Sequence, residues 1–283
     1  MDTIKLIRMK NRALGLVMPE KVARDNARLF LAPRTFPLKE WEKKAEQQGT
    51  RFGFGHGLSA IRWGNGERKI LLMHGWESRA TQMYGLASAL VSGGCQVIAI
   101  DAPLHGQSKG KQTSPVAFAQ AIVAADRELG PFDGAVGHSM GAVALAIARE
   151  AGSNLGRYAL VSSPARLYDT LIAFCSYMGL STGCTKRFVR HVEREVGRSA
   201  RDLDVARLMA GHTPAPLLVH ARNDREIPYE AVATIKRTLS GAAVWSANGL
   251  GHRRIVRDPT VASVVQQFVT TGTVAEQEVA AEQ

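Results

Sequence analysis

Short apolar runs alternate with longer amphipathic stretches along most of this chain. The runs are rich in Val, Ile and Leu, which is typical of strands that are buried on both faces of a parallel sheet. The stretches between them have apolar residues at helical spacing. The expected strands cover residues 69–73, 96–100, 134–137, 158–161, 217–220 and 243–245. The expected helices cover residues 81–91, 114–130, 140–151, 229–239 and 259–270.

This alternation predicts the fold class. Apolar strands joined by helical stretches are typical of an α/β fold with a mostly parallel central sheet and helices on both of its faces. Two further runs, 51–56 and 58–63, predict an antiparallel hairpin that opens the sheet, with Gly57 near its turn. A chain of 283 residues that is 45% hydrophobic can bury one large core. We expect residues 49–164 and 213–271 to form that core.

The first 48 residues have a weaker pattern. Val22, Asn26, Leu29 and Phe30 mark one helical face, and prolines follow this face at positions 33 and 37. We expect residues 1–48 to be an N-terminal helical extension docked on the core domain. A helix that binds a membrane surface or a partner protein is the alternative interpretation.

Neither a signal peptide nor a membrane-spanning segment is expected. The apolar stretch 13–18 is short and is followed by Pro19, which argues against a signal peptide. No run has the apolar length of a membrane span. Residues 272–283, rich in Ala, Glu and Gln, are expected to form a flexible tail.

A G-x-S-x-G pentapeptide, from Gly137 to Gly141, lies between an expected strand and an expected helix. A strand that turns at once into a helix strains its central residue, and the two glycines let neighbouring chains approach. The turn lifts the Ser139 hydroxyl clear of the sheet, at a helix N-terminus that favours developing negative charge. This context indicates a nucleophilic serine; a Gly-rich turn with an idle serine is the alternative.

A nucleophilic serine needs a general base and an acid that orients the base. In this type of fold the acid and then the histidine follow the serine along the chain. Asp224 follows the apolar run 217–220, and His252 ends a Gly-rich loop after the last expected strand. Ser139, Asp224 and His252 are therefore predicted to form a catalytic triad. Glu226, on the same loop as Asp224, is the alternative acid.

Acyl transfer also needs backbone N–H groups that bind the developing oxyanion. One is expected from Met140, the residue after the nucleophile. The other is expected from Trp76, in the turn that starts with His74 and Gly75 after the strand 69–73. Met140 and Trp76 are thus the predicted oxyanion hole.

Taken together, these motifs resemble the α/β-hydrolase superfamily in one colinear block from Lys69 to Thr270. The resemblance implies a serine hydrolase most similar to the small carboxylesterases and lipase-like members, and it does not fix the substrate. The chain departs from the family pattern at Trp76, Glu77 and Arg79, where many members have small residues, Pro or Gly. The matching pieces are His74-Gly75, Asp101, His105-Gly106, Ser108, the 137–141 pentapeptide, Asp224 and Gly251-His252.

Residues 165–212 form an insertion that is longer than an ordinary crossover between strands. Two parts of it, 167–174 and 186–192, have an amphipathic helical pattern. Hydrolases of this fold carry a cap over the nucleophile at this position, so we expect a helical cap. Its apolar residues either line an acyl-binding pocket or only bury the cap against the main domain. The residues concerned are Phe174, Tyr177, Met178 and Leu180.

Charge and cysteine content narrow the classes of partner. The net charge of +11 is compatible with anionic substrates such as acyl-CoA thioesters, with anionic lipid surfaces, or with a merely solvated basic surface. The basic residues are not interleaved with aromatic ones, and no nucleic-acid partner is expected. Cys95, Cys175 and Cys184 have no C-x-x-C spacing, which predicts reduced thiols in a cytoplasmic protein. No metal-ligand spacing or nucleotide motif is present, so no metal or cofactor is expected.

We therefore expect a cytoplasmic carboxylic-ester hydrolase that cleaves a small-molecule acyl ester through Ser139, His252 and Asp224. The oligomeric state does not follow from the sequence. His74, His105 and His138 are expected to be structural. An acyl-CoA or other thioesterase is one alternative, favoured by the basic cap. A hydrolase-like receptor that binds its ligand and turns it over slowly is the other.

Overall fold

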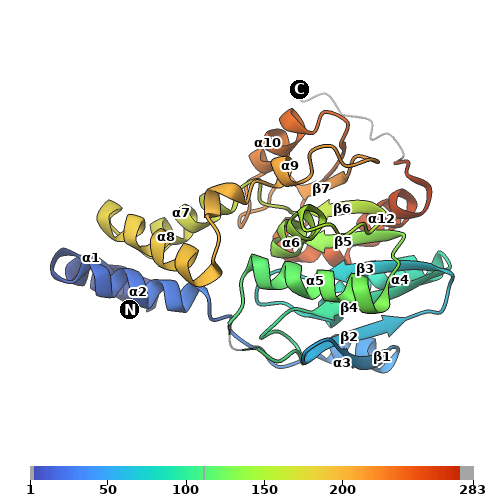
Figure 1. The fold of residues 1–283 in the computed structure, drawn as a ribbon, viewed down its shortest axis with the longest axis horizontal. Helices are drawn as coiled ribbons and strands as arrows, with labels where there is room; N and C mark the ends of the chain where they lie inside the picture. Colours follow the sequence, from blue (N-terminus) through green and yellow to red (C-terminus); the bar gives the residue numbers. More distant parts are fainter. Residues whose placement is uncertain (1–2, 111, 275–283) are drawn as a thin grey trace.

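The computed structural model describes residues 3–110 and 112–274, and an eight-stranded sheet forms its centre (Figure 1). The strand order is β1-β2-β4-β3-β5-β6-β7-β8. β1 and β2 form an antiparallel hairpin and β2 is antiparallel to β4, while the remaining neighbours are parallel. The strands are β1 (Thr50–Phe54), β2 (Leu58–Trp63), β3 (Arg68–Met73), β4 (Cys95–Asp101), β5 (Gly134–His138), β6 (Arg157–Val161), β7 (Leu217–Ala221) and β8 (Ala243–Ala247).

Helices cover both faces of the sheet, so the predicted α/β architecture and its opening hairpin are confirmed. The ends of most elements differ from the expected ones by a residue or two. The expected helix 81–91 begins as a 3₁₀ turn (Ala80–Met83), whose first N–H donates to Asp101 Oδ1 at 2.8 Å. The core helices are α4 (Tyr84–Ser92), α5 (Pro115–Leu129), α6 (Met140–Glu150), α9 (Val205–Leu208), α10 (Glu230–Thr238), α11 (Gly251–Arg254) and α12 (Pro259–Thr271).

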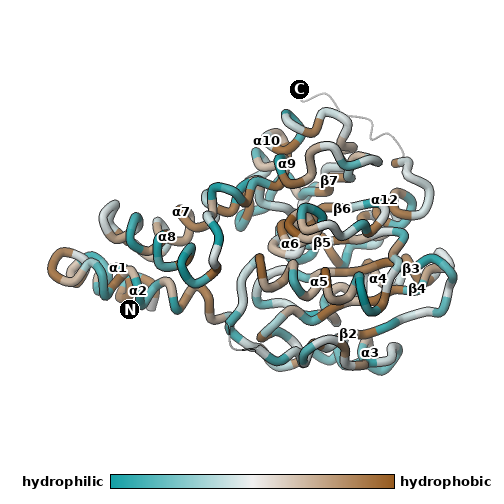
Figure 2. Tube along the Cα trace, viewed as in Figure 1, coloured by the Kyte–Doolittle hydropathy of each residue, from teal (hydrophilic) through white to brown (hydrophobic). Residues whose placement is uncertain are grey.

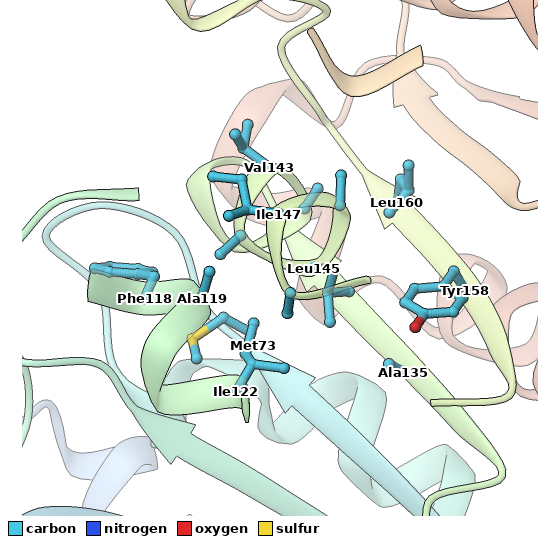
Figure 3. Close-up of a cluster of buried hydrophobic side chains, with 14 of the residues drawn as sticks. Met73, Phe118, Ala119, Ile122, Ala135, Val143, Leu145, Ile147, Tyr158 and Leu160 are labelled. Atoms are coloured by element: carbon cyan, nitrogen blue, oxygen red, sulfur yellow. The ribbon is translucent and has the colours of Figure 1, made fainter. Parts of the chain in front are cut away.

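The sheet is buried on both faces because successive side chains of its strands point to opposite sides. In β3, Leu71 and Met73 belong to the apolar cluster under α5 and α6 (Figure 3). Ile70 and Leu72 belong to the second cluster, under α4 and α12. This explains why the strands appear in the sequence as continuous apolar runs rather than alternating ones.

The N-terminal extension is more helical than the sequence pattern indicates. It contains α1 (Thr3–Val17), α2 (Pro19–Phe30) and α3 (Glu40–Gln47), of which only α2 matches the expected helical face. Pro19 occupies the first turn of α2, where its missing N–H does no harm, but it cannot continue α1. The extension contacts the core domain through α3, where the Trp63 Nε1–H donates to the Ala45 carbonyl at 2.8 Å. Its helix α2 packs along the cap helix α8 (Thr182–Val196), a contact that was not expected.

Four helices, α1, α2, α7 (Leu167–Tyr177) and α8, form a unit beside the sheet, which we call the helical unit (Figure 1). Ala23 and Ala27 of α2 have small side chains that let α8 approach closely. Phe188 and Val192 of α8 are buried in the same cluster and would be uncovered without α2. α2 therefore docks on the cap because the cap helices have an apolar face that needs a cover.

The last residues of the expected cap pack with the core instead. Residues 203–209, which the sequence pattern assigns to the cap, include Leu203, Val205 and Met209, buried in the core cluster under α5 and α6. Most of the expected tail, 275–283, lies outside the described residues. No helix within 3–110 and 112–274 combines the length and the apolar character that crossing a bilayer requires.

Candidate active site

Ser139 lies at the junction of β5 and α6, where the backbone is forced into an unusual conformation. Its φ is 53° and its ψ is −116°, which is unfavourable for a residue with a side chain. The flanking glycines make the junction possible. A Cβ on Gly137 would lie 2.6 Å from the Gly141 backbone, and a Cβ on Gly141 would lie 2.3 Å from the Met73 carbonyl oxygen. The strained turn therefore presents Ser139 at the carboxyl end of the sheet.

The loop after β3, residues 74–79, lies directly against this serine. A Cβ on Gly75 would lie 3.1 Å from the Cβ of Ser139, so a side chain there would crowd the serine. The backbone N–H groups of Trp76 and Met140 donate to no other residue within the described part of the chain. Both predicted oxyanion donors thus lie close to Ser139, and their N–H groups are free to bind a ligand.

Two neutral histidines fix the 74–79 loop. His74 Nε2 accepts the Ala102 N–H at 3.0 Å, and its Nδ1–H donates to the Gly75 carbonyl at 2.6 Å. His105 Nε2 accepts the Glu77 N–H at 3.1 Å. Burial lowers the pKa of both imidazoles, which keeps them neutral and able to accept these bonds. The geometry fits the structural role expected of them.

Asp224 and His252 come together from the ends of β7 and β8. Asp224 Oδ2 lies 2.8 Å from His252 Nδ1, and Asp224 Oδ1 accepts the N–H groups of Glu226 and Ile227 at 2.9 Å each. Burial raises the pKa of Asp224, but the hydrogen bonds outweigh it and the net pKa is lowered. Because the ionised carboxylate only accepts, His252 Nδ1 carries the proton and Nε2 is left free to act as a base.

Glu226, the alternative acid, occupies the other side of the same imidazole. Its Oε2 lies 4.0 Å from His252 Nε2, and its Oε1 forms an ion pair with Arg253 at 2.8 Å. Its side chain is 48% exposed, whereas that of Asp224 is fully buried. The Ser139 hydroxyl makes no hydrogen bond to any described residue, and hydrogen bonds between nucleophile and base are often long before substrate binds. Asp224, not Glu226, has the contact with Nδ1 that an orienting acid requires.

His138 is a buried neighbour of this site, and the folded protein disfavours its protonated form. Its Nε2–H donates to the His252 carbonyl at 2.9 Å, which fixes the backbone that carries His252. Burial lowers the pKa of His138 from 6.5 to about 3. A structural role was expected for His138 from the sequence. The contact itself could not be predicted, because His138 and His252 are far apart in the chain.

This pKa predicts a loss of stability in acid. Between pH 6.5 and about 3 the unfolded chain binds a proton at His138 that the folded chain does not. The free energy of unfolding should therefore fall as the pH falls through this range, by up to about 1.4 kcal/mol per pH unit for this group. Urea unfolding at stepped pH values measures the slope. His138→Gln, which keeps a side-chain N–H donor, should flatten it, and an unchanged slope would contradict the assignment.

The N-terminal extension reaches the 74–79 loop through three contacts that the sequence did not reveal. Phe30 stacks on Trp76 with ring centroids 6.0 Å apart, and Phe118 stacks on it at 6.1 Å. Arg34 binds the Glu77 carboxylate through Nε and Nη2 at 2.8 and 2.7 Å. Arg79 donates to the Phe36 carbonyl at 2.6 Å and forms an ion pair with the buried Glu42 at 3.3 Å. One feature of the sequence pointed to these contacts, namely the departure from the family pattern at Trp76, Glu77 and Arg79. All three of these residues bind the extension.

The cavity at Ser139 is small, and a larger groove adjoins it. The cavity has a volume of about 60 Å³ and is lined by residues that include Ser139, His252, Trp76 and Glu226. The adjoining groove, about 330 Å³, lies between residues 36–42 of the extension and the loops of the core. Residues that line both spaces are Glu77, Gln82, Arg253 and Val256.

The apolar residues of the cap do not line the cavity at Ser139, which was the first of the two roles considered for them. Phe174 packs edge-on against Phe30 and stacks on Phe188. Met178 is buried, and Tyr177 is mostly exposed. Among the described residues that line the cavity at Ser139, none comes from the cap. Their packing supports the other interpretation, in which they bury the cap, with α2 rather than the core as the main cover.

Metal-ligating clusters are absent from the described part of the chain. Within residues 3–110 and 112–274 no group of three or more His, Cys, Asp or Glu side chains is arranged to hold a metal ion. Asp101, one of the residues that match the family motifs, has its carboxylate occupied by donors of the chain itself. The carboxylate accepts from Arg51 at 2.7 Å and from the N–H groups of Ala80 and Gln107 at 2.8 and 3.0 Å.

Solved structures with the same fold include several hydrolases. An esterase from Pyrococcus furiosus is 19% identical, with 85% of this chain and 97% of that chain covered and a TM-score of 0.62. An esterase from Exiguobacterium antarcticum is 16% identical, with 79% and 100% covered and a TM-score of 0.59. The thioesterase domain from the curacin biosynthetic pathway is 17% identical, with 79% and 99% covered and a TM-score of 0.57. These likenesses show the fold.

The family follows from the sequence itself. No curated protein matches the chain. Residues 70–265, however, match the model of the alpha/beta hydrolase family, and this match spans the strained serine turn, the 74–79 loop and the loops of Asp224 and His252. The chain therefore belongs to the alpha/beta hydrolase family.

Proposed function

We propose that this hydrolase cleaves carboxylic esters of small molecules through Ser139, His252 and Asp224. Ser139 Oγ attacks the acyl carbonyl while His252 Nε2 takes its proton. The N–H groups of Trp76 and Met140 bind the oxyanion. Collapse of the intermediate expels the alcohol, which receives the proton from His252, and leaves an acyl group on Ser139. Water then releases the acid by the same steps.

One observation carries this proposal. A strained serine at the start of a helix shares a cavity with a histidine whose far nitrogen is bound by a buried, ionised aspartate. A serine hydroxyl is a poor nucleophile alone, and this set of contacts supplies what activates it. A structural turn would need neither the Asp224–His252 pair nor the free N–H groups beside it.

The size of the cavity indicates short acyl groups. About 60 Å³ beside Ser139 has room for an acetyl group or one slightly longer, whereas drug-sized ligands occupy about 300 Å³ or more. The alcohol part of the ester fits the adjoining groove, which is open and larger.

A thioesterase is the second candidate, and the charge of the groove favours it. The cations that line the groove, Lys39, Arg79, Arg253 and Arg257, outnumber its carboxylates, Glu42 and Glu77. Lys39 forms no ion pair within the described residues, whereas Arg253 is paired with Glu226. Cations at the leaving-group side would attract an anionic thiol such as coenzyme A. Thioesters need the same triad and oxyanion hole, so the two candidates differ in the leaving group alone.

A panel of p-nitrophenyl and CoA esters of graded acyl length tests the proposal. The proposed esterase should give its highest kcat/KM with p-nitrophenyl acetate or propionate and lose activity as the acyl chain lengthens. A higher kcat/KM for acetyl-CoA would favour the thioesterase. Tight ester binding without turnover would contradict both and favour the ligand-binding alternative.

The role of Trp76 predicts different effects for two substitutions. Trp76→Phe keeps the N–H and an aromatic ring between Phe30 and Phe118, so most of the activity should remain. Trp76→Pro removes the N–H and should lower kcat about 10²–10³-fold. Steady-state kinetics with p-nitrophenyl acetate measures both. Equally mild effects would show that the donor is another group.

Arg34 is proposed as a positioning residue for the same loop. Arg34→Gln removes the bidentate contact with Glu77 and should lower kcat about tenfold or more while KM changes little, because small misplacements of donors are costly. Arg24→Gln, at an exposed arginine of α2 without an ion pair among the described residues, is the matched control. Equal activity of the two variants would exclude this role.

A further inference from the structure

All large hydrophobic side chains that are exposed in the described residues belong to the extension or the cap. They are Leu6, Met9, Leu16, Val17, Met18, Leu29, Phe36 and Tyr177. None of those described lies on the α/β core, although the core is the larger part of the molecule. Soluble surfaces rarely gather apolar residues in this way, and such patches mark interaction sites.

Half of these residues lie on one face of α1. Leu6, Met9 and Leu16 follow the helical spacing of one face, and Leu16 and Val17 are 84% and 73% exposed. Asn11 marks the opposite face: it is buried and donates to the Met178 carbonyl at 2.8 Å. The apolar face therefore points away from the rest of the protein. Figure 2 shows hydrophobic colouring at the end of α1 that lies farthest from the sheet.

Cations flank the apolar face, and α1 contains no acidic residue. Lys5, Lys10 and Arg12 are exposed, and none of them forms an ion pair with a described residue. An apolar stripe flanked by unpaired cations complements a surface that is apolar inside and anionic at its boundary. That is the surface of a bilayer with anionic lipids, on which such helices lie flat.

We propose that the outer face of α1 docks the protein on anionic lipid surfaces. Leu6, Met9, Leu16 and Val17 enter the boundary between headgroups and acyl chains, and the flanking cations bind lipid phosphates. The helical unit, to which α1 is fixed through Asn11, would then lie next to the lipid with the sheet beyond it. This proposal does not rest on the proposed catalytic function, because its readout is binding of the intact chain.

Co-sedimentation with vesicles tests it. The full chain should bind vesicles of phosphatidylcholine with phosphatidylglycerol, bind vesicles of phosphatidylcholine alone far more weakly, and dissociate at high salt. Lys5→Gln/Lys10→Gln/Arg12→Gln should weaken binding about a hundredfold. Leu16→Glu/Val17→Glu, at exposed positions that do not support the fold, should weaken it at least as much.

Lys44→Gln/Lys109→Gln/Arg127→Gln is the matched control, since it removes the same charge from exposed positions on other elements. An equal loss of binding in this control would overturn the proposal, because net charge alone would then explain the attraction. Equal binding to both kinds of vesicle would overturn it too. So would a dimer, measured by light scattering, that Leu16→Glu/Val17→Glu converts to monomer, since α1 would then bind a second copy.

Discussion

Ser139→Ala and His252→Ala are each expected to lower kcat by about 10⁶-fold, and the double variant is expected to be no worse than either single one. Nucleophile and base act as one unit, so removing either abolishes the covalent route. What remains is the small contribution of the N–H groups of Trp76 and Met140 and of substrate binding. Steady-state kinetics with p-nitrophenyl acetate, on variants shown to unfold like the parent protein, measures the three losses.

Ser162→Ala is the matched control for this prediction. Ser162 also follows a strand, has a positive φ of 49° and is fully buried, and its hydroxyl has no partner among the described residues. Its removal should leave kcat unchanged. Losses that add up in the Ser139 and His252 double variant would contradict a common mechanism for the two residues.

Asp224→Asn is expected to lower kcat by up to about 10⁴-fold, while Glu226→Gln should cost less than about tenfold. The amide that replaces the Asp224 carboxylate would present an N–H or a neutral oxygen to His252 Nδ1, which permits the wrong tautomer and leaves the imidazolium unstabilised. Glu226 lies 4.0 Å from the other nitrogen, Nε2, and is already paired with Arg253, so its charge contributes little to orientation.

The same pair of variants separates catalysis from stability. Asp224 is buried and its pKa is lowered, so it stabilises the fold above its unfolded pKa, and the stabilisation is lost as the pH falls through the folded pKa. Asp224→Asn should therefore unfold at a somewhat lower urea concentration at neutral pH, but stay folded without urea.

The activities of the two variants decide which residue is the acid. If Glu226→Gln lost more activity than Asp224→Asn, the orienting acid would be Glu226.

The sequence predicted the fold well because the strands are local apolar runs. β3, β5 and β7 have residues buried on both faces, so each strand is visible without knowledge of its neighbours. The candidate site follows from the same elements. Parallel strands end at one edge of the sheet, so residues that directly follow different strands, such as Ser139 and Asp224, are brought to one place.

The contacts through which the extension docks did not follow from the sequence, because they join residues that are distant in the chain. Arg34 and Glu77 are ordinary surface residues by pattern, and only the fold brings them within 2.7 Å. α1 was missed because it has apolar residues on more than one side, the half-buried Ile7 and Leu14 as well as the exposed Leu6 and Leu16, so no single apolar stripe marks it as a helix. The small cavity was missed for a similar reason, since the side chains that border it come from loops that meet only in the folded protein.

Covalent labelling with a fluorophosphonate probe tests the central claim most directly. Such probes react with serines activated by a neighbouring base, so peptide mass spectrometry after labelling identifies the nucleophile itself. We predict a single adduct on Ser139, greatly slowed in His252→Ala and absent in Ser139→Ala. An adduct on Ser108, Ser162 or Ser163, or an equal labelling rate with and without His252, would contradict the assignment of Ser139 and His252 as nucleophile and base.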